Sequence, residues 1–274
     1  MDHFDHDPAA RWARAHYATG AESGRLTRGP GVLELARTRE LLREHLPPSP
    51  ARVADVGAGP GVYSVWLAGE GYDVVARDIA PRHVDELRSA AAAAGVPVDA
   101  AVGDARALDL PDDSCDAVLL LGPLYHLVQR ESRVRALREA ARVVRPGGVV
   151  AAAAISRWAV LVDAVLRGRF GEGVPGFSGI LDEALRTGVL APLVEDGFSA
   201  YCHRPDELRG EMTDAGLAVV ELVAVEGPGA VLPDLEQRWA DDVAREAVLD
   251  AARRLESVPE VLGFGPHLLA VGRA

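Results

Sequence analysis

Three glycines in the segment VADVGAGPG are the first residues whose type and spacing could serve a ligand. Gly57, Gly59 and Gly61 follow an apolar run that predicts a buried strand. Glycine is required where a ligand comes too close to the backbone for a Cβ, or where a turn needs positive φ. A turn at the carboxyl end of a parallel strand is where open α/β sheets bind ligands. The sequence therefore predicts a binding turn at 57–61.

Two further carboxylates follow the next predicted strands. Asp78, with Ile79 after it, ends the second strand, and its two oxygens could accept the vicinal hydroxyls of a ribose. Asp104 stands beside Ala105 after the third strand, where the pair would suit an adenine amino group and ring edge. The combination predicts a nucleoside-containing ligand.

The glycine spacing opposes two familiar nucleotide sites. A dinucleotide fingerprint, G-x-G-x-x-G, would need glycine at Val62, whereas this turn has G-x-G-x-G with Pro60 inside it. A phosphate-binding P-loop needs a lysine after its glycines, and the chain contains no lysine. An NAD-linked oxidoreductase is therefore a disfavoured alternative.

Candidate residues for the reaction follow the fourth strand. Leu121 and Gly122 end that strand and would form a floor beside the reacting group, and Tyr125 and His126 follow in GPLYHL. A histidine with a pKa near neutrality suits general-base work, so His126 is the candidate base and Tyr125 is expected to face the substrate.

Residues outside this region complete the candidate set. Tyr17 is a second catalytic candidate, and Trp158 and His203 are expected to contact substrate. No metal is expected: the residues that imitate a metal site lie in a terminal segment, and neither cysteine has metal-site spacing. Those residues are His3, Asp5, His6 and Asp7, and the cysteines, expected to be packing residues, are Cys115 and Cys202.

Strand-like apolar runs alternate with amphipathic helical stretches between residues 51 and 156. This alternation predicts a doubly wound, mostly parallel α/β sheet. The expected strands are 52–55, 73–77, 98–102, 117–121 and 149–155, and the expected helices are 62–69, 83–94 and 132–144.

Three further segments flank this core. Residues 1–50 should form a helical segment, with a helix at 30–46, that covers the cofactor site; residues 157–203 should form a helical insertion after strand five. The insertion, with helices at 158–166 and 178–187, is expected to be a substrate lid, and packing in a homodimer is the alternative. Residues 204–274 should complete a sheet of about seven strands with helices at 205–215 and 241–258 and strands at 218–225 and 267–272.

Taken in order, DVGAGPG, Asp78, GDA, DAVLLLGPLYHL and VVRPGG resemble the motifs of class I S-adenosylmethionine-dependent methyltransferases, across residues 51–150. The resemblance implies a Rossmann-like fold, S-adenosylmethionine as cofactor and S-adenosylhomocysteine as product. It places the glycine turn along the methionine part, Asp78 on the ribose and Asp104 at the adenine N6, with Asp55 near the amino-acid end. The flanking segments are similar to a bacterial small-molecule branch, which implies natural-product biosynthesis as a setting.

Charge and composition restrict the acceptor and the partners. With 29 basic and 41 acidic residues the net charge is −12, which repels nucleic acids and anionic membranes. No apolar run approaches a membrane span and no targeting segment precedes residue 10, so a cytoplasmic protein is expected. A small, fairly apolar acceptor is predicted, methylated on oxygen, nitrogen or carbon. The alternative is a non-catalytic cofactor-binding or partner protein that kept the fold.

Overall fold

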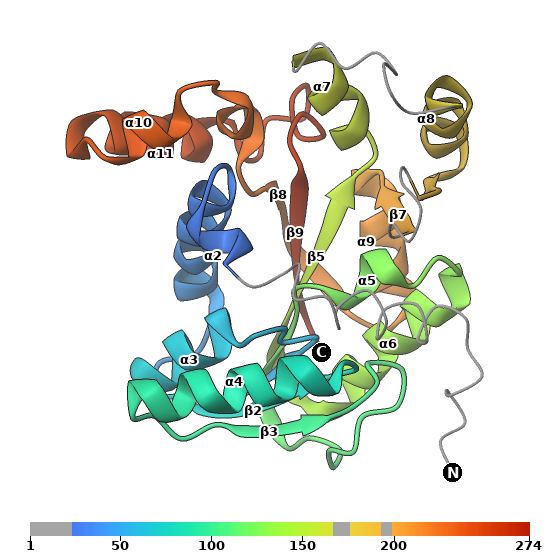
Figure 1. The fold of residues 1–274 in the computed structure, drawn as a ribbon. Coiled ribbons are helices and arrows are strands. Elements are labelled where there is room, and N and C mark those ends of the chain that lie inside the picture. Colours follow the sequence, from blue (N-terminus) through green and yellow to red (C-terminus); the bar gives the residue numbers. More distant parts are fainter. Residues whose placement is uncertain (1–23, 167–175, 193–198) are drawn as a thin grey trace.

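The structure, a computed structural model, describes residues 24–166, 176–192 and 199–274. A central sheet carries helices on both faces (Figure 1). Its strands are β1 (Arg52–Val56), β2 (Asp73–Asp78), β3 (Asp99–Val102), β4 (Cys115–Leu120), β5 (Val144–Ser156), β6 (Val189–Leu190), β7 (Ala200–His203), β8 (Ala218–Ala224) and β9 (His267–Arg273).

Short and long helices connect these strands. They are η1 (Arg25–Thr27), α2 (Gly31–His45), α3 (Val62–Gly69), α4 (Pro81–Ala94), α5 (Pro123–His126), α6 (Arg130–Val143), α7 (Ala159–Leu166), α8 (Phe177–Thr187), α9 (Pro205–Asp214), η2 (Gly227–Val231), α10 (Leu235–Trp239) and α11 (Asp242–Leu255). Among the described residues, no helix has the length and apolar character that crossing a membrane requires.

The strand order confirms the predicted α/β class with a mostly parallel sheet. Strands β3, β2, β1, β4 and β5 lie side by side in parallel, and β9 then pairs antiparallel with both β5 and β8. The expectation of about seven strands is too low, because the described residues form nine. The two extra strands are β7, which pairs with the last two residues of β5, and the two-residue β6 beside it.

The inner strands are buried on both faces, as expected for parallel strands covered by helices. Along β4, Val118 and Leu120 pack in the cluster that contains α6 and α9, whereas Ala117 and Leu119 pack in the cluster that contains α2 and α3. All four side chains are fully buried. This two-residue alternation places successive side chains of β4 against the helices on opposite faces of the sheet.

The junction between α6 and β5 differs from the sequence prediction. Helix α6 ends at Val143, and β5 already begins at Val144, whereas the predicted strand begins only at residue 149. A Cβ at Gly148 would lie 2.5 Å from a Val144 methyl carbon and 2.8 Å from the Asp116 carbonyl oxygen. Glycine therefore lets β5 pack closely against β4 at this point.

Candidate functional site

A cleft opens at the carboxyl ends of β1, β2 and β4, and the predicted glycine turn forms one wall. Gly57, Gly59 and Gly61 all have positive φ, at 73°, 55° and 91°. A Cβ at Gly57 or Gly61 would collide with Pro123 or Leu87, at 2.6 and 2.5 Å. A Cβ at Gly59 would meet nothing within 4 Å. The outer glycines thus serve packing, and Gly59 is the point where a ligand can approach the backbone.

Asp78 closes the turn from β2. One of its carboxylate oxygens accepts a hydrogen bond from the Gly59 backbone N–H at 2.8 Å, and the other accepts one from the Ala80 N–H at 2.8 Å. The same oxygen also lies 3.2 Å from Nδ1 of His83. Asp78 and Ile79 both line the cleft, where the sequence predicted them. The carboxylate is held by backbone on both sides and is therefore fixed in position before any ligand binds.

Asp55 lies deeper, at the end of β1. Its side chain is buried, and one oxygen accepts a hydrogen bond from the Ser64 hydroxyl at 2.6 Å. Burial, reinforced by the nearby charge of Asp78 and opposed by the Ser64 hydrogen bond, raises the pKa of Asp55 to about 6. Two adjacent carboxylates of this kind give the floor of the cleft a negative potential, which suits a positively charged ligand group.

Asp104 and Ala105 also line the cleft, on the loop after β3. The Asp104 carboxylate is engaged by Arg106, whose Nη2 and Nε donate to it at 2.7 and 3.0 Å. The Arg106 backbone N–H adds a third bond at 2.9 Å. A carboxylate offers about four lone pairs, so a ligand amino group could still be accepted beside Arg106.

The opposite wall follows β4. Leu121 and Gly122 line it, and Tyr125 and His126 come from the single-turn helix α5. The two aromatic rings meet edge to face, with centroids 4.6 Å apart. A Cβ at Gly122 would lie 3.5 Å from the Tyr125 hydroxyl, at ordinary contact distance, so the phenol lies directly against the strand end. The structure therefore brings the predicted cofactor residues other than Gly61, and two of the candidate reaction residues, into one cleft.

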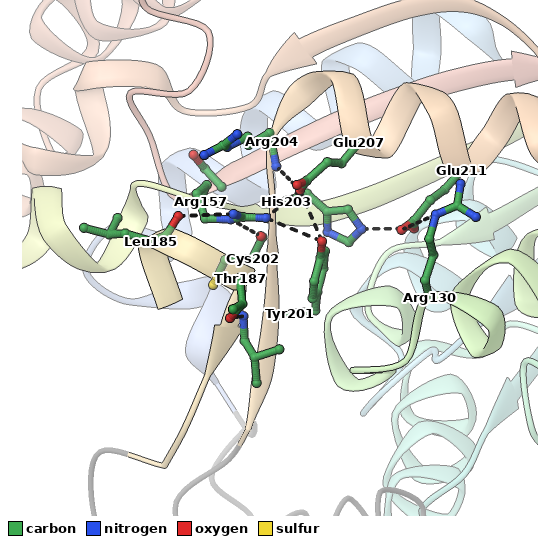
Figure 2. A network of polar contacts seen from close by, with 12 residues as sticks. Arg130, Arg157, Leu185, Thr187, Tyr201, Cys202, His203, Arg204, Glu207 and Glu211 are labelled. Carbon is green, nitrogen blue, oxygen red and sulfur yellow. Dashed lines mark hydrogen bonds and ion pairs between the residues drawn. The ribbon is translucent and has the colours of Figure 1, made fainter. Parts of the chain in front are cut away.

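His203 lies outside the described residues that line the cleft, in a buried polar cluster, so its contact with substrate stays a prediction. Figure 2 shows its ring joined to Glu211; the Nε2 to carboxylate distance is 3.2 Å, and the histidine is fully buried. Burial lowers the pKa of His203 even though Glu211 opposes that shift. Arg133 also donates to Glu211, at 2.6 Å, so this group ties α6 to α9. The His203 ring thus packs in the contact between β7, α6 and α9.

Neither Trp158 nor Tyr17 is among the described residues that line the cleft. Trp158 is 40% exposed and packs beside Gly263, and the described residues that line the cleft do not include it. Tyr17 lies outside the described residues.

Sequence reasoning missed several residues of the cleft wall. Those that carry polar groups are Arg25, Tyr63, His83 and Arg106. His83 and Arg106 lie within five residues of Asp78 and Asp104, so proximity along the chain was the available signal. Arg25 and Tyr63 reach the cleft only through the packing of η1 and α3, and no local pattern marks them.

Comparison with known proteins gives a consistent family signal. Residues 53–148 match a family described as a methyltransferase domain. The chain is similar to an uncharacterized methyltransferase of Mycobacterium tuberculosis, at 42% identity over 104 residues, or 38% of this chain and 39% of that protein. The chain therefore spans well under half the length of that relative.

A longer match is to the malonyl-acyl-carrier-protein O-methyltransferase of Methylococcus capsulatus, 32% identical over 202 residues, covering 72% of this chain and 69% of that protein. Among solved structures, the fold is similar to the 1,6-didemethyltoxoflavin-N1-methyltransferase of Burkholderia thailandensis, whose structure contains 1,6-didemethyltoxoflavin and S-adenosylhomocysteine. The TM-score is 0.59 at 17% identity, over 96% of this chain and 88% of that one.

Proposed function

This chain belongs to the class I S-adenosylmethionine-dependent methyltransferases, and on that basis we propose that it transfers a methyl group from S-adenosylmethionine to a small, fairly apolar acceptor. The observation that carries the proposal is the cleft itself. There the glycine turn, Asp78 and Asp104 face a second wall that contains Tyr125 and His126. One wall suits a nucleoside and the other suits an acceptor.

The residues of the first wall fit the cofactor. The open space over Gly59 admits a ligand against the backbone, and the fixed Asp78 carboxylate can accept the ribose hydroxyls. Asp104 and Ala105 would hold the adenine edge, and Asp55 would lie toward the amino-acid end. When bound, the cofactor supplies an electrophilic methyl group on a sulfonium.

The remaining task of the chain is alignment. Holding a nucleophile in line with the methyl and the sulfur can provide about 7 to 11 kcal/mol through proximity alone. Tyr125 would orient the acceptor, and His126 would accept a proton where the acceptor is a hydroxyl or a carbon acid. An amine acceptor can attack the methyl group before it loses a proton, so it depends less on a general base. The importance of His126 therefore depends on the atom that is methylated.

The competing proposal is a protein that binds the cofactor and does not turn it over. The aromatic and histidine wall opposite the glycine turn favours an enzyme, because a simple cofactor-binding module has no need of it. We also propose a cytoplasmic setting, a role in natural-product biosynthesis and no nucleic-acid partner, the last supported by the net charge of −12. We also propose packing in a homodimer as the alternative role of the insertion, residues 157–203.

Calorimetry and a transfer assay test the proposal together. We expect S-adenosylhomocysteine to bind with a micromolar Kd, about −8 kcal/mol, and NAD to bind far more weakly. S-adenosylmethionine with a labelled methyl group, presented with a panel of small phenols, amines and acids, should then label at least one acceptor. Binding without transfer to any compound of the panel would favour the non-catalytic alternative, and tighter binding of NAD would reject the cofactor assignment.

A further inference from the structure

A small second cavity adjoins the cleft and ends in a cluster of charges. Tyr63, Leu121 and Tyr125 border both spaces, so the cavity adjoins the cleft. Its other walls include Thr38, Val225, Glu34 and His267. The cavity measures about 10 Å³, which is room for one water-sized group. Only a single oxygen atom of a molecule whose body lies in the cleft would therefore fit beside His267.

His267 is the centre of that cluster. Its Nδ1 lies 2.6 Å from a carboxylate oxygen of Glu226 and 3.7 Å from one of Glu34. The second oxygen of Glu226 accepts the backbone N–H of His267 at 3.3 Å, and the Glu226 side chain is almost fully buried. Three segments far apart in sequence, α2, the end of β8 and the start of β9, thus converge on one imidazole ring.

Arg25 and Tyr63 complete the charged and titratable groups around the ring. Arg25 donates to both oxygens of Glu34, at 2.5 and 2.9 Å. Burial and the charge of Glu34 raise the pKa of Tyr63, so its phenol stays neutral. Two carboxylates are therefore balanced by Arg25 and a protonated His267, and the cluster is close to neutral as a whole.

The carboxylates orient the ring and favour its charged form. Burial alone would lower the pKa of His267, but Glu34 and Glu226 outweigh it and raise the pKa to about 9. Because both carboxylates engage Nδ1, the Nε2 edge is the part of the ring left for a molecule in the cavity. The protein thus presents a fixed N–H donor at the end of an apolar cavity.

We propose that His267 determines acceptor specificity: its Nε2–H binds an anionic oxygen of the acceptor, which is therefore a small apolar or aromatic molecule that carries a phenolate or a carboxylate. This inference rests on the proposed methyl transfer, for which it names the substrate class. The proton stays on His267 throughout, so the residue positions the acceptor and takes no part in bond making. Glu226 and Glu34 act through it, as positioning residues.

Nuclear magnetic resonance of the full chain with labelled histidines, saturated with S-adenosylhomocysteine, tests the proposal. The probes are benzoate and 4-nitrophenolate, with benzyl alcohol as the uncharged control. We expect saturable shifts of the His267 ring signals with at least one anionic probe and none with benzyl alcohol. The response to each anion identifies the oxygen type. His267→Gln should weaken binding of that probe at least tenfold and leave the Kd of S-adenosylhomocysteine within twofold.

Glu226→Gln distinguishes ligand recognition from a purely structural role. Removing this carboxylate should lower the pKa of His267, so binding of benzoate, which stays ionised, should become weaker between pH 6 and pH 8, whereas benzoate binding to the parent protein stays nearly constant over that range. Retained binding of S-adenosylhomocysteine by both variants shows that they fold.

Three results would overturn the inference. They are the absence of any anion-dependent shift at His267, unchanged probe affinity in His267→Gln, and stoichiometric binding of Mn²⁺ or Zn²⁺ that requires His267, Glu34 and Glu226. The last result would identify a cation site, since their ligand atoms lie within 4.8 Å of one another. Failure of the parent protein to bind S-adenosylhomocysteine would instead reject the proposed function.

Discussion

The Asp78 carboxylate accepts hydrogen bonds from the backbone N–H groups of Gly59 and Ala80, and so connects the glycine turn to the start of α4. We expect Asp78→Ala to weaken binding of S-adenosylhomocysteine by about 1.5 to 3 kcal/mol, because two ribose hydroxyls lose a charged acceptor. The matched control is Asp73→Ala, at the exposed opposite end of the same strand, which should bind as the parent does. Equal affinities for all three proteins in calorimetry would contradict a ribose role for Asp78.

Asp55 should leave a signature in the pH dependence of stability. Its pKa is raised to about 6 from an ordinary value of 3.8, so ionising it costs the folded state progressively as pH rises through this window. Asp55→Asn removes that ionisation, and the amide oxygen can still accept from Ser64. The stability of the variant relative to the parent should rise by up to about 3 kcal/mol between pH 3.5 and pH 7. Urea unfolding at several pH values measures this, and a difference that stays constant with pH would refute it.

Local chemistry explains which single residues could be predicted. Gly57, Gly59 and Asp78 follow directly from their strands, so sequence spacing alone placed them in the cleft. The buried pairing of His203 with Glu211, eight residues further along the chain, had no recognisable signal in the sequence. His267 was not recognised because Glu34 and Glu226 are distant in the chain. Long-range packing therefore decides the surroundings of His267.

At the scale of elements, apolar periodicity predicted the five parallel strands and the main helices to within a few residues. It did not predict β6 and β7, whose two and four residues are too short for a pattern. Nor did it place β9 between β5 and β8, because antiparallel register depends on pairing between distant segments.

Helices α6 and α9 are joined by a buried and an exposed ion pair, and Arg130 of the exposed pair also lies 4.0 Å from Glu211 of the buried one. The two pairs differ in burial, which allows a comparison. The buried pair is Arg133 with Glu211, and the exposed pair is Arg130 with Asp214. Glu211→Gln leaves the Arg133 guanidinium buried without its counter-charge and should cost about 3 to 5 kcal/mol of unfolding free energy. Asp214→Asn should change it little, because both partners are half exposed. Similar losses for the two variants in denaturant unfolding would contradict this assignment.

The insertion helices α7 and α8 are weakly buried, with Ala164 and Ala184 as their fully buried described residues. Helices with so little burial should open readily, so we expect their amides to exchange hydrogen faster than those of α6. If the insertion acts as the predicted substrate lid, cofactor product and acceptor together should slow this exchange. Slow exchange without ligands that becomes fast on dilution would support dimer packing instead.

At the scale of the whole molecule, ion pairs connect helix α2 near the N-terminus with helix α11 near the C-terminus. Arg37 of α2 pairs with Glu256 after α11, and Arg253 of α11 donates to Glu40 of α2 at 2.8 Å. The cluster around His267 lies on the same side of the sheet and also involves α2. Segments before and after the core motifs in sequence therefore also border the small cavity beside the cleft.

This connection makes the stability of the entire fold sensitive to alkaline pH. The pKa of His267 is about 9 in the folded protein and near 6.5 when unfolded, so the folded state gains stability from the bound proton below pH 6.5. That contribution is lost as pH rises through 9. The stability advantage of the parent protein over His267→Gln should therefore fall by up to about 3 kcal/mol between pH 6 and pH 10. Glu226→Gln removes one of the two carboxylates that raise the pKa of His267. The pKa of His267 in the folded variant should therefore be lower, and the stabilising contribution of its proton should be lost at a lower pH than in the parent. Urea unfolding across this range provides the measurement, and parallel curves for the parent and His267→Gln would show that the proton on His267 does not stabilise the fold.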